Sequence, residues 1–214
     1  MATIVCGSKK YNNRNFDSVV DGFDTIVRAN MLLPDMGYGK KDSTIQVCNN
    51  HVYDHYQRKA CVDELAHEYR EKTNREHVTK FRDFFMNTDA EFIHYEHNNI
   101  NTMRKIMFHY DLNCLTGGFL LKCGLAYVAQ CIYNNVKPFI VGISLEEEDL
   151  TKHTYNHHNN LYKGHDHSGE IRLIIELHKK QLIDASFCLV EDKEELSLSN
   201  HFEPTNEALE ILKC

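Results

Sequence analysis

The sequence contains only three prolines among 214 residues, and no stretch rich in proline and glycine divides it. A single domain over residues 1–214 is therefore expected, because a chain of this length can bury one sizeable core. No run approaches the roughly 18 uninterrupted apolar residues of a membrane-spanning helix. The first residues also lack the basic start and long apolar core of a secretory signal. These absences predict a protein without a transmembrane segment, located in the cytoplasm.

A continuous basic stripe is also missing, because 24 Lys and Arg residues are interspersed with 31 Asp and Glu residues, for a formal net charge of -7. Tracking a phosphate backbone requires such a stripe, so nucleic acid is not an expected partner. No CxxC pair occurs among the eight cysteines, which argues against a zinc ribbon and against a thioredoxin-type redox site. Several cysteines lie in apolar runs and are expected to be buried free thiols: Cys6, Cys48, Cys123, Cys131 and Cys188.

Short runs rich in β-branched residues predict strands at 2–7, 24–30, 43–49, 91–96, 138–143 and 186–191. Helical spacing of apolar residues lies between some of them, over 120–133 and 171–180, and residues 52–82 are expected to add covering helices. This alternation, with strands apolar on both faces, predicts an α/β fold with a mostly parallel, twisted sheet flanked by helices. In such folds, ligands bind beyond the carboxyl ends of the strands.

Two glycine-containing segments are candidates for binding a phosphate group. Gly7 and Ser8 follow the first predicted strand, but the GxGxxG and GxxxxGK[ST] motifs are absent, and an ordinary tight turn is the favoured explanation. Thr116 can cap the helix predicted after it, while Gly117 and Gly118 leave the first amide groups of that helix uncovered for an anion. Paired glycines that merely relieve crowding against the sheet explain the second segment equally well.

The segment "YKGHDHSGE", residues 162–170, places His165 and His167 just before a predicted helix and Glu170 in its first turn. A neutral imidazole there could act as a general base, because an unperturbed pKa of about 6.5 suits proton abstraction at neutral pH. A zinc site is a second hypothesis, since five histidines lie between 153 and 167, although they form no HExxH pair. A solvated, histidine-rich loop without function is the third.

Three stretches, in this order along the chain, carry recognisable motif residues. The first is "VVDGFDTIVRANMLLPDMGYGKKDSTIQVCNN", with Asp24, Val27, Arg28, Asn30, Pro34, Gly37, Tyr38, Thr44 and Asn49. The second holds Thr116, Gly117, Ala126, Cys131 and the strand that ends in "IVGIS". The third is the H-x4-E pair of His165 and Glu170, preceded by a YxGH segment that starts at Tyr162. Together these stretches resemble the long, short and very short motifs of the animal sialyltransferases, and YxGH is similar to the bacterial enzymes.

The resemblance implies a single Rossmann-like domain, a GT-A-like variant, with inverting glycosyltransferase activity. Its substrates would be a CMP-activated sialic acid, or a related ulosonic acid, and a glycan hydroxyl, without a required metal or other cofactor. His165 would be the general base, and Glu170 would support it. The implied donor-binding positions are Gly7, Ser8, Asn30, Asn49, Thr116, Gly117, Gly118 and Tyr162. The family also places a histidine or tyrosine against the leaving phosphate, for which the candidates are His153, Tyr155, His157 and Tyr162.

Some positions depart from the family pattern. Gly7 and Ser8 stand where the family has Gly-Asn, which leaves open another donor such as CMP-Kdo, or a noncatalytic nucleotide- or glycan-binding protein. The partner cysteine of the animal disulfide is missing, so that Cys131 is expected to be unpaired. Bacterial members often carry an aspartate at the position of Ser144. The short chain implies that the acceptor lid is either the 145–164 loop or a second subunit, which leaves a homo-oligomer open.

Overall fold

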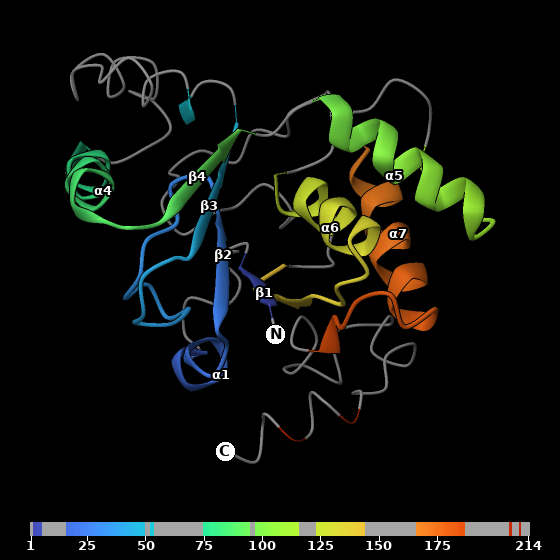
Figure 1. The fold of residues 1–214 in the computed structure, drawn as a ribbon, viewed down its shortest axis with the longest axis horizontal. Coiled ribbons are helices and arrows are strands. Elements are labelled where there is room, and N and C mark those ends of the chain that lie inside the picture. The colour runs from blue at the N-terminus through green and yellow to red at the C-terminus, as the bar shows by residue number, and fades with distance from the viewer. Residues whose placement is uncertain are drawn as a thin grey trace.

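The computed structural model describes residues 2–5, 16–49, 52–53, 75–94, 97–115, 123–143, 166–186, 206 and 210. Within these ranges the strands form one all-parallel sheet in the order β4-β3-β2-β1-β5 (Figure 1). The strands are β1 (Ala2–Val5), β2 (Thr25–Ala29), β3 (Ile45–Cys48), β4 (Glu91–His94) and β5 (Phe139–Val141). The predicted α/β fold with a parallel sheet is therefore confirmed.

Helices cover both faces of the sheet (Figure 1). One face carries α5 (His97–His109), α6 (Cys123–Tyr133) and α7 (His167–Lys179). The opposite face carries α1 (Asp17–Asp21), α4 (Arg75–Asn87) and the loop of residues 31–38. The result is three layers, with a separate hydrophobic core on each side of the sheet.

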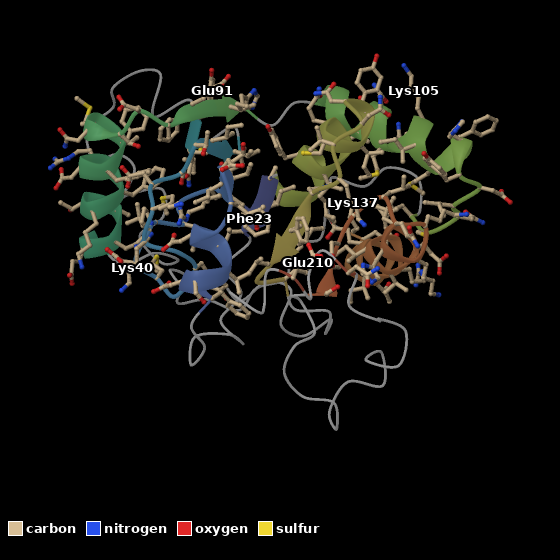
Figure 2. All side chains as sticks on the ribbon, turned by 60° about the horizontal axis from the view of Figure 1, so that its bottom comes forward. Phe23, Lys40, Glu91, Lys105, Lys137 and Glu210 are labelled. Atoms are coloured by element: carbon tan, nitrogen blue, oxygen red, sulfur yellow. The ribbon has the colours of Figure 1, made fainter. Side chains whose placement is uncertain are left out.

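Alternation along the strands supplies both cores. Ile4 of β1 and Val27 of β2 belong to the core under α5, α6 and α7, whereas their neighbours Val5 and Ile26 belong to the opposite core. Each fully buried aliphatic side chain contributes about 1.5–3 kcal/mol of transfer free energy, so both helix layers are held to the sheet by apolar burial. Figure 2 shows the contrast between Phe23, which lies inside beside the sheet, and Lys105 of α5, which points outward.

The predicted element boundaries hold with small shifts. Helix α7 starts at His167, so that this residue lies inside the helix instead of before it, because Asp166 caps the helix by accepting from Gly169 N at 2.9 Å. The predicted helical region 52–82 contributes α4, while residues 54–74 lie outside the described part. Beside β5, Asp184 forms an isolated parallel bridge with Phe139, two residues before the strand predicted at 186–191. Of that predicted strand only Ser186 is described, and it is not in a strand, while residues 187–191 lie outside the described part.

The expectation of buried thiols is confirmed for Cys48 and Cys131, which are buried and form no disulfide bond. Cys114, which was not predicted, is a third such thiol, and burial raises the pKa of Cys131 to about 12. Cys6 and Cys188, and the side chain of Cys123, fall outside the described residues. Among the helices that the structure describes, none has the length and apolar character needed to cross a membrane.

The loop between β2 and β3 is fastened to α1 through backbone amides. Asp17 Oδ1 accepts from Gly39 N at 2.9 Å, and Asp21 Oδ1 accepts from the amides of Lys40 and Lys41 at 2.9 and 3.0 Å. Gly39 has a φ of 89°, and a Cβ atom on it would lie only 2.6 Å from Val20 Cγ1. The loop therefore requires glycine at this position.

We expect Gly39→Ala to lower the free energy of unfolding by about 2–3 kcal/mol, because it combines a strained backbone conformation with a steric clash. Urea denaturation followed by circular dichroism measures this change. Gly22→Ala is the matched control, since Gly22 has a φ of -72° and a Cβ atom on it would lie no closer than 3.3 Å to its nearest neighbour, Val19 O. Equal losses for the two variants would contradict the tight packing of Gly39 against α1.

Candidate functional site

The candidate site lies at the carboxyl edge of the sheet. Because all described strands are parallel, β1, β2 and β3 end at the same edge, where Asn30 follows β2 and Asn49 follows β3. Helices α6 and α7 each lead into a segment parallel to the strands, namely β5 and the bridge residue Asp184, so both helices begin at this edge. The chain order reverses at β1, between β2 and β5, and open parallel sheets bind ligands outside the carboxyl ends at such a reversal.

The two asparagines predicted to bind the donor contact each other directly. Asn30 Oδ1 accepts from the backbone N–H of Asn49 at 3.0 Å, and Asn49 Oδ1 in turn accepts from Val52 N at 3.0 Å. Asn30 has a φ of 52°, a left-handed conformation that asparagine tolerates better than most residues. Its own N–H donates to Val47 O at 2.7 Å, which continues the β2–β3 pairing by one residue. The fold thus brings Asn30 and Asn49 together as one unit.

Arg28, which also belongs to the first motif, stabilises the fold. Its side chain is fully buried, and Nη2 donates to the carbonyl oxygens of Tyr38 and Gly39 at 3.0 and 3.1 Å. Burial lowers the pKa of Arg28 to about 10, although nearby carboxylates, Asp21 first among them, raise it. The guanidinium therefore stays charged at neutral pH and holds the 31–44 loop against the sheet.

The start of α7 packs closely on the segment that leads to Thr116. Arg172 Nη2 donates to the carbonyl oxygen of Cys114 at 3.1 Å. A Cβ atom on Gly169 would lie 2.7 Å from the same oxygen, so only glycine permits this approach. Glu170, in the first turn of α7, is 1 % exposed, and its charge is favourable near a helix N-terminus. The contact at Cys114 brings the second and third motif regions side by side.

Most of the other predicted site residues lie outside the described part of the chain. They are Gly7, Ser8, Thr116, Gly117, Gly118, Ser144, His153, Tyr155, His157, Tyr162 and His165. His165 directly precedes Asp166, the N-cap of α7, and Thr116 follows the last described residue of its segment, Leu115. Within the described ranges, no group of three or more His, Cys, Asp or Glu residues is placed to hold a metal ion. The histidines between 153 and 165 lie outside these ranges.

Gln46 was not singled out from the sequence, although the structure joins it to Asn30. Its side chain is fully buried in the middle of β3, and Nε2 donates to the carbonyl oxygen of Asn30 at 2.6 Å. A signal was present in "TIQVC", where a polar residue interrupts an otherwise apolar strand and must find partners inside the fold.

No protein-family model matches the chain, and a comparison with curated proteins finds no match either. The motif residues and the geometry of the carboxyl edge are therefore the basis on which a function can be inferred.

Proposed function

We propose that the chain is a sialyltransferase-like glycosyltransferase, which transfers sialic acid or a related ulosonic acid from a CMP-sugar to a glycan hydroxyl. The observation that carries this proposal is the 3.0 Å contact between Asn30 and Asn49 N, at the carboxyl ends of adjacent strands. Both residues are among the positions that the resemblance assigns to the donor. A Rossmann-like, GT-A-like arrangement of one domain over residues 1–214 belongs to the same proposal.

The packing of α7 gives a second, independent support. Gly169 and Arg172 hold the start of α7 against Cys114, two residues before Thr116. The proposal sets His165 and Glu170 beside the glycine pair that follows Thr116. This is the arrangement that a general base and a phosphate-binding turn need if both are to act on one bound donor.

In the proposed reaction, His165 takes the proton from an acceptor hydroxyl as the hydroxyl oxygen attacks the anomeric carbon of the sugar. The bond from that carbon to the CMP phosphate breaks, CMP leaves with the electron pair, and the configuration inverts. The uncovered amides of Gly117 and Gly118 would stabilise the charge that develops on the phosphate. One of His153, Tyr155, His157 or Tyr162 would also face it, while Glu170 would orient the base. In this proposal the chain's own donors replace a metal ion.

The proposed location is the cytoplasm. The free thiols of Cys48, Cys114 and Cys131 would stay reduced there. The proposed partners are the nucleotide-sugar donor and a glycan acceptor, with nucleic acid excluded and a homo-oligomer left open. A second subunit would supply the acceptor lid if the 145–164 loop does not.

The test is release of CMP from CMP-sialic acid and from CMP-Kdo, measured by chromatography with a panel of glycan acceptors. We expect acceptor-dependent release of CMP from at least one donor, unchanged after exhaustive treatment with a chelator. UDP- and GDP-sugars under the same conditions are the matched controls. A strong loss on chelation that zinc or manganese restores would contradict the metal-free reaction, and turnover of UDP- or GDP-sugars alone would contradict the donor assignment.

A further inference from the structure

Buried side chains form a continuous hydrogen-bonded chain that runs from the 31–44 loop to Asn30. Arg28 Nη1 donates to Ser43 Oγ at 3.1 Å, and Ser43 Oγ donates to Gln46 Oε1 at 2.9 Å. Gln46 Nε2 then donates to the carbonyl oxygens of Asn30 and Leu32, at 2.6 and 3.1 Å. Arg28 and Gln46 face each other in register across β2 and β3, and both are fully buried.

The chemistry of these groups permits one orientation of the Gln46 amide. A guanidinium only donates, so Ser43 Oγ accepts from Arg28 and gives its own hydrogen to Gln46 Oε1. Backbone carbonyls only accept, so Nε2 must face Asn30 and Leu32. The flipped amide would set its oxygen against two carbonyl oxygens in a buried site, at the cost of several hydrogen bonds. Arg28 and Ser43 therefore determine which end of Gln46 faces Asn30.

Gln46 in turn determines the backbone conformation and the side-chain direction of Asn30. It holds the backbone carbonyl of Asn30 where this residue adopts its left-handed conformation, with a φ of 52°. The side-chain oxygen of Asn30 is then directed to Asn49 N. Because the two ends of a planar amide are fixed together, this contact also sets the direction of Asn30 Nδ2, the atom that can donate to an anion.

We propose that Gln46 is a positioning residue for the CMP part of the donor, an inference that rests on the proposed function. It contacts no ligand itself, because its side chain is 0 % exposed. It acts by fixing the conformation of Asn30, and through Asn30 the place of Asn49, so that their amide groups meet the nucleotide without rearrangement. Preorganised donors bind an anion more tightly than donors that must first be ordered.

The test compares Gln46→Met with Thr44→Val by calorimetric titration with CMP, at a temperature at which both variants are folded. Gln46→Met keeps the side-chain length and removes both polar ends, and we expect CMP affinity to fall about 10-fold. Thr44→Val is the matched control, because Thr44 Oγ1 accepts from Ile26 N at 3.1 Å and lies before β3, at the amino edge of the same two strands. We expect its affinity to stay within about twofold of the unmodified chain.

A second variant and a ligand-free readout cover the case in which Gln46→Met does not fold. Ser43→Ala removes the group that orients the Gln46 amide, and we expect a loss of CMP affinity of about threefold. Hydrogen exchange at Asn49 N, which Asn30 holds, should accelerate in Gln46→Met and Ser43→Ala but not in Thr44→Val. If the unmodified chain binds no CMP, the proposed function fails. If it does bind CMP and all variants bind equally, or exchange at Asn49 is unchanged, the positioning role is overturned.

Discussion

His165→Ala is expected to reduce the rate of sugar transfer at least about 10²-fold, while CMP binding stays nearly unchanged. The expectation follows from the role of the imidazole, which would remove the acceptor proton in the transition state and need not hold the nucleotide. Its position in the sequence suits this role, since it directly precedes Asp166, the residue that caps α7. Transfer assays at saturating donor, together with CMP titration of the same variant, separate the loss of chemistry from a loss of binding.

His167→Ala is the matched control for this experiment. The same substitution two residues later removes another imidazole from the same segment, at the first residue of α7. We expect it to retain most of the transfer activity. If His167→Ala were the crippling change and His165→Ala were nearly neutral, the alignment with the H-x4-E motif would be wrong by two residues.

Asn30→Asp is expected to weaken CMP binding about 10²-fold with little change in fold stability. Aspartate keeps an oxygen that can accept from Asn49 N and tolerates the left-handed backbone, so the local structure is retained. It replaces the Nδ2 donor by a negative charge at a position proposed to meet the nucleotide, and this charge would repel the negatively charged CMP. Calorimetric titration with CMP measures the affinity, and thermal denaturation checks the fold.

Asn135→Asp supplies a closely matched control, because Asn135 also has a positive φ, 56°, and lies between α6 and β5 at the amino edge of the sheet. Asn135→Asp changes the charge by the same amount as Asn30→Asp and places aspartate in the same left-handed backbone conformation. Its position, however, is remote from the carboxyl edge. We expect unchanged CMP affinity. A similar loss of affinity in both variants would mean that net charge, and not the Asn30 position, governs binding.

Strands β1, β2, β3 and β5 were predictable because they are buried on both faces, whereas β4, at the edge of the sheet, is only partly buried. Ile26 and Val27, for instance, pack into opposite cores, and a run that is apolar at successive positions is typical of a central parallel strand. The order of the strands was not predictable in this way. Which strands become neighbours depends on packing between segments far apart in the sequence, such as β1 against β5.

Two helices were missed for different physical reasons. Helix α1 is five residues long, too short for a helical period to emerge from "DSVVD". Helix α5 starts at His97, and asparagines, which favour turns, follow directly after it. These polar residues obscured the helical spacing of the apolar residues Ile100, Met103 and Met107, which the structure shows to be buried. Tertiary packing against α6 overrides this local preference.

The two asparagines were identified through the resemblance, whereas their direct hydrogen bond required the fold. The sequence separates Asn30 from Asn49 by a loop whose path depends on Arg28, Ser43 and Gln46. Each of these contacts joins residues from different elements or from the loop between them, and no local spacing rule predicts them. A buried polar residue in a strand indicates that a partner exists but does not indicate which one.

The most direct test of the account is titration of the unmodified chain with CMP, CDP, UMP, UDP and GDP, followed by thermal shift and calorimetry. A ligand that binds only the folded state at 100 times its Kd stabilises that state by about 2.7 kcal/mol, so the preference is easily measured. We expect selective stabilisation by CMP or CDP. Preference for a uridine or guanosine nucleotide, or no response to any of the five, would contradict the proposed donor site.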